Sequence, residues 1–304
     1  MVVSILIPTF RRNKLLARAV RSCLDQCNIA SKDYEIVVVD NCSNKSAQHV
    51  VENFKDAQAT VLYVHEPRRG VAFARNTAVS VARGDYIAFL DDDECATSNW
   101  LSELLKHGLE GSAAVFGPIH EAVDDNLQDK RDMFDFSIVR RYFNRVDGDD
   151  ISDCLYDLGT GNSLFNKHQC FGAEEPFDER HNFLGGEDIE FLSRLRNRKV
   201  RFTWAAKAWV NEYVPEERLT TRYLMKRRFH AGQVRTIVAS KSRRFGTVQV
   251  LLWMAVGGMQ ILYYSVRYLI AFLRRRDTSN CAARIAGGAG KLVFFVRQNN
   301  CSST

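Results

Sequence analysis

Four consecutive acids, Asp91 to Glu94, follow the short apolar run Tyr86-Ile-Ala-Phe-Leu90. An apolar run of this length with aromatic and β-branched residues is typical of a buried strand. The acids then lie at the carboxyl end of that strand, where open α/β sheets bind their ligands. Because carboxylates this close repel one another, they indicate a cation among them. The stretch therefore predicts a divalent metal that carries a phosphorylated ligand.

A second acidic pair, Glu187 and Asp188, stands at the start of a predicted helix. Apolar residues recur behind the pair at helical spacing, at Ile189, Leu192 and Leu195. The helix dipole favours carboxylates at this position, so the pair also has a purely structural explanation.

The elements that position the first acids alternate between strand and helix patterns. Strands are predicted over 2–9, 34–40, 60–64 and 85–90, and helices over 11–27, 43–54 and 71–81. This alternation is typical of a parallel sheet covered by helices on both faces. Pro8, Thr9, Asp40 and the four acids each end or follow a strand, so we expect them at one edge of the sheet.

The middle of the chain is less regular. We predict a helix over 99–107, a strand over 113–117, and a helix near 130–143 inside the acid-rich segment 121–153. The run Gly159-Thr-Gly-Asn-Ser-Leu-Phe165 is typical of a turn that feeds a strand. Its glycines would let the backbone approach a ligand closely.

The net charge of +6 is unevenly distributed, because residues 222–297 hold 15 Lys or Arg and one acid, Asp277. A basic tail suits anionic lipid, phosphate or nucleic acid. Within it, the 22 residues 245–266 carry no charge. A helix of that length, at ~1.5 Å per residue, covers roughly the hydrocarbon thickness of a bilayer. Since this apolar run replaces the interleaved aromatic residues of a nucleic-acid surface, no nucleic-acid partner is expected.

Two features argue against a simple membrane span. Gln249, Gln260 and Arg267 fall on nearly one helical face, and basic clusters flank both ends of the run. We therefore expect a monotopic or re-entrant helix at an anionic membrane surface, with a single span or a buried packing helix as alternatives. The eight cysteines lack metal-site spacing, and the N-terminus enters a strand directly, which predicts reduced thiols in the cytoplasm.

Together these motifs resemble family 2 glycosyltransferases, an inverting group with the GT-A fold. The resemblance rests on five motifs in order: Ile7-Pro-Thr-Phe10, Val38-Val-Asp-Asn41, Gly70-Val-Ala-Phe-Ala-Arg-Asn76, Phe89-Leu-Asp-Asp-Asp93 and Gly185-Gly-Glu-Asp188. The chain is also similar to bacterial enzymes that extend lipid-linked exopolysaccharide units of the succinoglycan type. That similarity rests on Gly159-Thr-Gly-Asn162 and Arg227-Arg-Phe-His-Ala-Gly-Gln233.

The resemblance implies a Rossmann-like, nucleotide-sugar-binding mixed α/β sheet flanked by helices. The catalytic domain would cover 1–218, and a basic, partly apolar helical tail for membrane association would cover 219–304. It also implies Asp188 as the base that deprotonates the acceptor hydroxyl, with Glu187 beside it. Asp91 and Asp93 would hold Mg or Mn, which neutralises the departing diphosphate.

Further residues are implied as contacts of the nucleotide: Pro8, Thr9, Asp40, Arg75, Asp91 and Asp92. Without the resemblance, Asp40 reads as a turn-forming acid and Arg75 as a surface cation on a helix. Arg227 and Arg228 would bind a diphosphate, although a basic helix beside anionic lipid explains them almost as well. Their motif differs from the Gln-x-x-Arg-Trp of processive relatives, which favours addition of a single sugar.

The implied function is metal-dependent, inverting transfer of one hexose, glucose in the first instance, from a UDP-sugar. The acceptor would be a polyprenyl-diphosphate-linked oligosaccharide at the cytoplasmic face of the inner membrane, with a polysaccharide-assembly complex as a further partner. One alternative is a glycosyltransferase with a soluble or protein acceptor. Another is a non-catalytic nucleotide-sugar-binding subunit, against which the intact acidic motifs argue.

Overall fold

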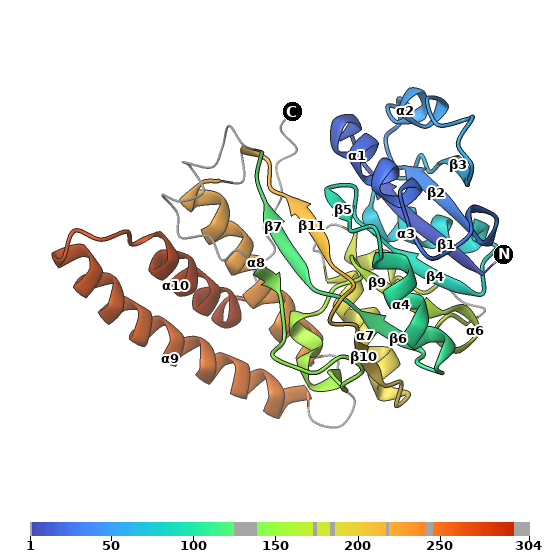
Figure 1. Ribbon diagram of the computed structural model, residues 1–304. Helices are drawn as coiled ribbons and strands as arrows, with labels where there is room; N and C mark the ends of the chain where they lie inside the picture. Colours follow the sequence, from blue (N-terminus) through green and yellow to red (C-terminus); the bar gives the residue numbers. More distant parts are fainter. Residues whose placement is uncertain are drawn as a thin grey trace. The chain divides into compact units, whose positions relative to one another are not determined.

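The computed structural model describes residues 2–124, 139–172, 175–182, 186–216, 219–240 and 246–294. The chain divides into two compact units, one holding Met1–Ala122 with Ser137–Tyr213 and the other Val123–Phe136 with Val214–Thr304. The first unit is a mixed α/β structure and the second is helical (Figure 1).

Seven strands form the main sheet of the first unit, in the order β10-β6-β9-β4-β1-β2-β3 (Figure 1). Only β9 among them runs antiparallel to its neighbours, so the other six end at one edge of the sheet. The mixed sheet that the family resemblance implies is confirmed. The strands are β1 Val3–Thr9, β2 Tyr34–Asp40, β3 Thr60–His65, β4 Tyr86–Phe89, β6 Ala114–Phe116, β9 Ser163–Asn166 and β10 Phe202–Trp204.

Helices cover both faces of this sheet, as the alternating pattern predicts. One core contains side chains of α1 and α4, among them Leu16 and Trp100, against the strands. The other contains side chains of α3 and α7, among them Ala78 and Phe191. The helices of the unit are α1 Asn13–Leu24, α2 Gln48–Glu52, α3 Val71–Val81, α4 Trp100–Leu109, α6 Lys167–Cys170 and α7 Glu187–Asn197, with short 3-10 turns at Ser31–Asp33, Ser152–Asp157 and Glu179–His181.

The helix predicted over 43–54 is much shorter, because α2 begins only at Gln48. The Asp40 carboxylate accepts hydrogen bonds from the backbone N–H of Cys42, at 2.9 Å, and of Ala47, at 2.7 Å. Because one side chain binds the backbone at Cys42 and at Ala47, the residues between them form a loop, and the helix begins after it.

A second sheet, β5-β11-β7-β8, was not predicted from the sequence. Its short strands are β5 Glu94–Ala96, β7 Ile119–Ala122, β8 Val139–Arg141 and β11 Val210–Tyr213. The helix predicted near 130–143 falls largely outside the described residues, and where it is described, at β8, it is wrong. There Arg141 pairs with Ile119 in an antiparallel ladder, so sheet pairing overrides the local helical pattern.

The second unit contains three described helices, α8 Thr221–Ser240, α9 Gly246–Leu273 and α10 Ser279–Leu292. Glycines let these helices approach closely, since a Cβ at Gly257 of α9 would lie 2.8 Å from the carbonyl oxygen of Gly288 in α10. A Cβ at Gly232 of α8 would overlap the carbonyl of Gly287. α10 was not predicted from the sequence.

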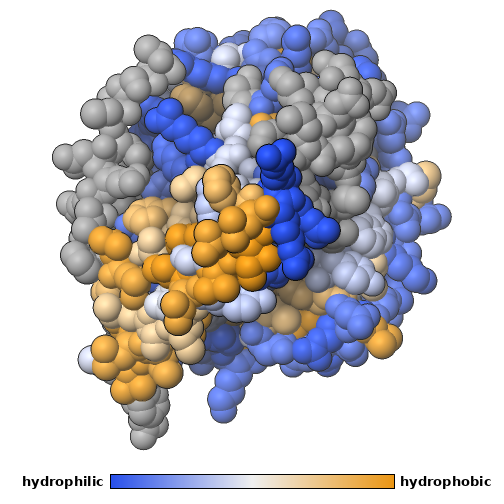
Figure 2. Space-filling view, turned by 90° about the vertical axis from the view of Figure 1, so that its left-hand side faces the viewer, coloured by the Kyte–Doolittle hydropathy of each residue, from blue (hydrophilic) through white to orange (hydrophobic). Residues whose placement is uncertain are grey.

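α9 begins at Gly246, inside the predicted uncharged run 245–266, and extends seven residues beyond its end, to Leu273. Its length and composition would allow it to cross a membrane, and only 6% of its most apolar window is buried. Gln260 of the predicted polar stripe faces α10, donating to the carbonyl of Arg284 at 2.6 Å and accepting from Lys291 Nζ at 2.7 Å. Figure 2 shows an exposed apolar surface, to which α9 contributes Leu251, Leu252, Met259, Leu262, Tyr263, Val266, Leu269, Phe272 and Leu273.

Candidate active site

The acidic cluster, defined here as Asp91, Asp92 and Asp93, follows β4 at the carboxyl edge of the main sheet. Thr9 ends the neighbouring strand β1, and its hydroxyl donates to Asp92 Oδ2 at 2.8 Å. Arg12 Nη1 donates to Asp92 Oδ1 at 2.8 Å and to Asp93 Oδ2 at 2.9 Å. The structure thus brings the predicted Thr9 and Asp92 together. Arg12 was not predicted as a site residue, although its position three residues after the end of β1 indicates that it lies at the same edge of the sheet.

Close packing raises the pKa values of two carboxyls in the acidic cluster. Burial is the first cause of the raised pKa of Asp93, about 6, and the negative charges of Asp91 and Glu212 add to it, while Arg12 opposes it. Burial likewise raises the pKa of Asp92, against the opposing effect of Arg12 and Thr9. An added cation would therefore be attracted to this cluster.

Whether the cluster fits a divalent metal depends on its donor set. Within the described ranges, no three His, Cys, Asp or Glu side chains are arranged to hold a metal ion by themselves. Mg²⁺ in nucleotide sites, however, uses one or two carboxylates and completes its shell with phosphates and water. The partly exposed Asp91 and the buried Asp93 can supply such carboxylates together with a donor diphosphate. Their role as metal ligands stays a prediction.

The Glu-Asp pair, Glu187 and Asp188, opens α7 directly after Gly186, which has a left-handed φ of 90°. Glu187 is buried and accepts a close hydrogen bond from Arg75 Nη1. Asp188 Oδ1 accepts the backbone N–H of Ile189 at 2.7 Å. Burial, and then the charge of Glu187, raise the pKa of Asp188 to about 6, while Arg75 opposes the rise.

The loop Gly159–Asn162 lies against both groups of acids. A Cβ at Gly159 would lie 3.0 Å from Asp188 Oδ2, and a Cβ at Gly161 would lie 2.8 Å from Asp91 Oδ2. Glycine at both positions therefore allows the backbone to pass between the acidic cluster and the Glu-Asp pair. The two groups, far apart in the sequence, share one site through this loop.

The buried side chains of Arg141 and Trp100 donate hydrogen bonds to the loop. The Arg141 guanidinium donates to the carbonyls of Gly159, Gly161 and Asn162, at 3.2, 2.9 and 2.5 Å, and to that of Gly117 at 2.8 Å. Asn162, whose φ is 49°, accepts from Trp100 Nε1 at 2.7 Å. Arg141 was missed because its segment was predicted as a helix, whereas it forms β8, and its partners are distant in sequence.

Arg75 links the two groups of acids. It is only 6% exposed on α3, pairs with Glu187, and has Nη2 3.7 Å from Asp91 Oδ1. The reading of Arg75 as a surface cation is therefore wrong, because the side chain is buried among carboxylates. Its predicted contact with a nucleotide stays a prediction.

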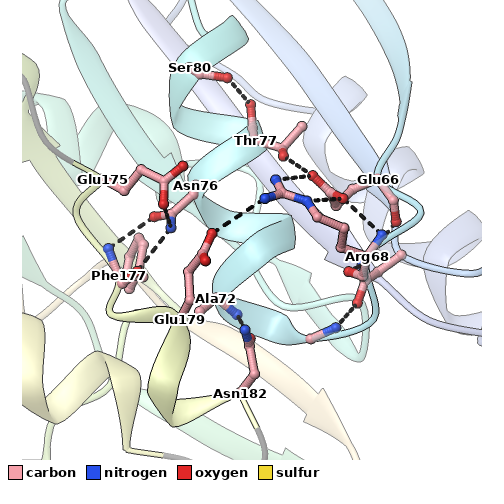
Figure 3. A network of polar contacts seen from close by, with 12 residues as sticks. Glu66, Arg68, Ala72, Asn76, Thr77, Ser80, Glu175, Phe177, Glu179 and Asn182 are labelled. Carbon is pink, nitrogen blue, oxygen red and sulfur yellow. Dashed lines mark hydrogen bonds and ion pairs between the residues drawn. The ribbon is translucent and has the colours of Figure 1, made fainter.

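Residues 175–182, which precede the Glu-Asp pair in the chain, are hydrogen-bonded to α3 (Figure 3). Asn76 both donates to the carbonyl and accepts from the N–H of Phe177, each at 2.9 Å, and Asn182 Oδ1 accepts from Ala72 N at 2.8 Å. Glu66, whose pKa Arg68 lowers to about 2, also accepts from Thr77 of the same helix. The motif Gly70–Asn76 thus anchors the approach to α7.

The other predicted nucleotide contacts lie in two places. Pro8 and Asp40 lie at the carboxyl edge, and both Asp40 oxygens already accept backbone N–H groups. Arg227 and Arg228 lie on α8 in the second unit. All four stay predictions.

Comparison with known proteins gives one consistent result. The family model "Glycosyl transferase family 2" matches residues 4–166, more than half of the chain. The succinoglycan biosynthesis protein ExoM of Rhizobium meliloti is 30% identical over 237 residues, which cover 76% of this chain and 73% of that protein. A GalNAc(5)-diNAcBac-PP-undecaprenol beta-1,3-glucosyltransferase of Campylobacter jejuni is 34% identical over 117 residues, 38% of this chain and 37% of that enzyme.

Among solved structures, S. aureus TarS 1-349 in complex with UDP has a TM-score of 0.59 at 16% identity, covering 84% of this chain and 70% of that one. At this identity the likeness shows the fold alone. The sequence relatives and the fold agree with the motifs around the site, and the chain belongs to glycosyltransferase family 2.

Proposed function

We propose that this glycosyltransferase moves one hexose from a UDP-sugar to a lipid-linked oligosaccharide, with inversion at the anomeric carbon. The lipid-linked acceptor is suggested by the undecaprenol-linked acceptor of the Campylobacter relative, and UDP by the TarS complex. Glucose is the first sugar to test, since that relative is a glucosyltransferase.

The observation that carries the proposal is the shared loop. Gly159 lies against Asp188 and Gly161 against Asp91, so one backbone segment borders both the candidate base and the candidate donor-binding acids. A displacement that inverts the sugar needs a base on the acceptor side and charge neutralisation on the leaving-group side. Two separate groups of acids around one loop meet that requirement.

Each group has a proposed role. Asp188, with a pKa of about 6, would be ionised at neutral pH and accept the proton of the attacking hydroxyl. Asp91 and Asp93 would hold a divalent ion, which supplies charge neutralisation for the diphosphate when bound. Arg12, which already bridges Asp92 and Asp93, would keep the cluster from repelling itself before the donor arrives.

The second unit is proposed to hold the enzyme on the membrane, with α9 in the plane of the cytoplasmic leaflet. Midway along α9, Gln260 is bonded to α10, whose Lys291 is buried beside it. If α9 crossed the bilayer upright, this lysine would lie near the hydrocarbon centre, at considerable cost. Lying flat, α9 would insert its exposed apolar face and leave the polar contacts with α10 at the headgroups.

Extraction and topology experiments test the membrane proposal. Membranes containing the protein would be washed with high salt and then with detergent; release only by detergent is expected. Release by high salt alone would contradict insertion. Tags before α9 and after α10 should both be digested by protease from the cytoplasmic side, whereas a span would protect one of them.

A donor and acceptor screen tests the proposed activity. UDP- and GDP-sugars would be incubated with the protein and membrane extracts containing lipid-linked acceptors, scoring nucleotide release and the mass of the extended lipid. One added hexose from a UDP-sugar is expected. Transfer to a soluble or protein acceptor only, or nucleotide-sugar binding without any transfer, would overturn the proposal.

A further inference from the structure

Arg141 lies at the meeting point of three backbone segments near the site. It ends β8, is 4% exposed, and its guanidinium reaches the carbonyls of Gly117, Gly159, Gly161 and Asn162. Arginine offers five N–H donors in a rigid planar fork, and no other side chain can satisfy four carbonyls from one centre. The residue is therefore built into the loop and not merely packed beside it.

The loop that Arg141 holds separates two groups of reacting side chains. There is no room for a methyl group between Gly161 and Asp91 Oδ2, or between Gly159 and Asp188 Oδ2, without movement. Because the loop backbone borders both carboxylates, a shift of the loop toward either one would press on Asp91 or Asp188. The position of the guanidinium therefore bears on the spacing of the two carboxylates.

We propose that Arg141 is a positioning residue, which sets the separation between the base Asp188 and the donor-side Asp91 through the loop Gly159–Asn162. This inference rests on the proposed function for the roles of the two acids. Arg141 is proposed to act on the two acids through its hydrogen bonds to the carbonyls of the loop. Misplacement of reacting groups by about 1 Å can lower a rate by roughly 100-fold.

The rival explanation is that Arg141 only stabilises the fold. Four carbonyls would lose a hydrogen-bond partner on its removal, which lowers folding stability. A purely structural residue would lower the melting temperature but leave the turnover of the folded molecules unchanged. A positioning residue lowers kcat even in molecules that are fully folded.

The test compares Arg141→Lys and Arg141→Met with a matched control, Arg198→Lys. Arg198 also donates to two backbone carbonyls, those of Gln169 and Cys170, away from the loop. All variants are assayed well below their melting temperatures, with the folded fraction counted by UDP titration. We expect kcat to fall about 100-fold in both Arg141 variants, and no fall in the control.

Two further readouts separate this inference from the proposed function. Hydrogen exchange should accelerate at residues 159–163 in Arg141→Met and not in Arg198→Lys, whether or not a sugar is transferred. Added guanidinium ion at millimolar concentration should restore part of the turnover of Arg141→Met. Unchanged exchange in the loop, or unchanged kcat of the folded variants beside an active wild type, would overturn the inference. An inactive wild type with the expected exchange would instead contradict the proposed function.

Discussion

The acidic cluster and the Glu-Asp pair are both crowded groups of carboxylates, yet different neighbours compensate their charges. The cluster is bridged by Arg12, whose side chain is 35% exposed and stands beside the start of α1. The pair is compensated by Arg75, whose side chain is 8% exposed, and by the start of its own helix. One cation can exchange partners with solvent and ligands, while the other is enclosed.

This difference suggests which group binds charge and which handles a proton. A partly exposed arginine can move aside for, or contact, an arriving diphosphate, so the acidic cluster is suited to binding. The enclosed Arg75 tempers the raised pKa of Asp188 without removing it, which leaves a carboxylate with a pKa of about 6. Binding and turnover should therefore respond to different substitutions.

The largest effect is expected for Asp188→Asn. The amide cannot accept a proton, so transfer should fall by roughly 10²–10⁴-fold, the usual contribution of a general base. Turnover is measured from the mass of extended acceptor, with Glu190→Gln in the same helix as the control. Near-normal turnover of Asp188→Asn would show that the base is another group.

Removal of divalent ions is expected to have the next largest effect. Chelation should reduce transfer by about 100-fold or more, because the leaving diphosphate loses its neutralising charge. Added Mg or Mn should restore the rate in the wild type but not in Asp93→Asn. Full activity in the presence of chelator would contradict metal dependence.

The two glycines of the loop offer a finer separation of the two groups. In Gly161→Ala the methyl would press on Asp91 Oδ2, and in Gly159→Ala on Asp188 Oδ2. We expect Gly161→Ala to weaken UDP binding by roughly 10-fold and Gly159→Ala to lower kcat by a similar factor. If both substitutions changed the same parameter, either the affinity for UDP or kcat, the proposed difference between the two groups of acids would be contradicted.

The smallest effect concerns pH. The base must be ionised to act, so at saturating metal and donor the rate should fall as pH drops through about 6, the pKa of Asp188. Glu187→Gln removes a like charge and frees Arg75, and both changes lower the pKa of Asp188. The acidic limb of the pH–rate profile should therefore move to lower pH; movement to higher pH would contradict the assignment.

Sequence patterns predicted the strands that carry the site, because each of these strands is defined by its own local run of apolar residues. The apolar runs before Thr9, Asp40 and Asp91 define strands by themselves, and strand ends in one direction meet at one edge. Arg12 and Arg141 escaped prediction because their partners are distant in sequence. Arg12 binds Asp92 and Asp93, and Arg141 binds carbonyls of the loop Gly159–Asn162.

The helical unit shows the same limit. The uncharged run predicted α9 directly, whereas α10 went unnoticed because its contacts are made by Gly287, Gly288 and Gly290. Helices that pack through glycine lack the apolar stripe on which sequence patterns rely. The sequence places Gln260 on a polar stripe of α9, and in the structure its side chain donates to the carbonyl of Arg284 in α10.

Titration calorimetry of UDP, in the presence of Mg or Mn, tests the division between binding and turnover most directly. It would compare wild type, Asp188→Asn and Asp93→Asn under one set of conditions. We predict wild-type affinity for Asp188→Asn and affinity weakened by at least about 10-fold for Asp93→Asn, as expected when a charge-assisted contact is lost. Equal weakening in both variants, or none in Asp93→Asn, would contradict the account.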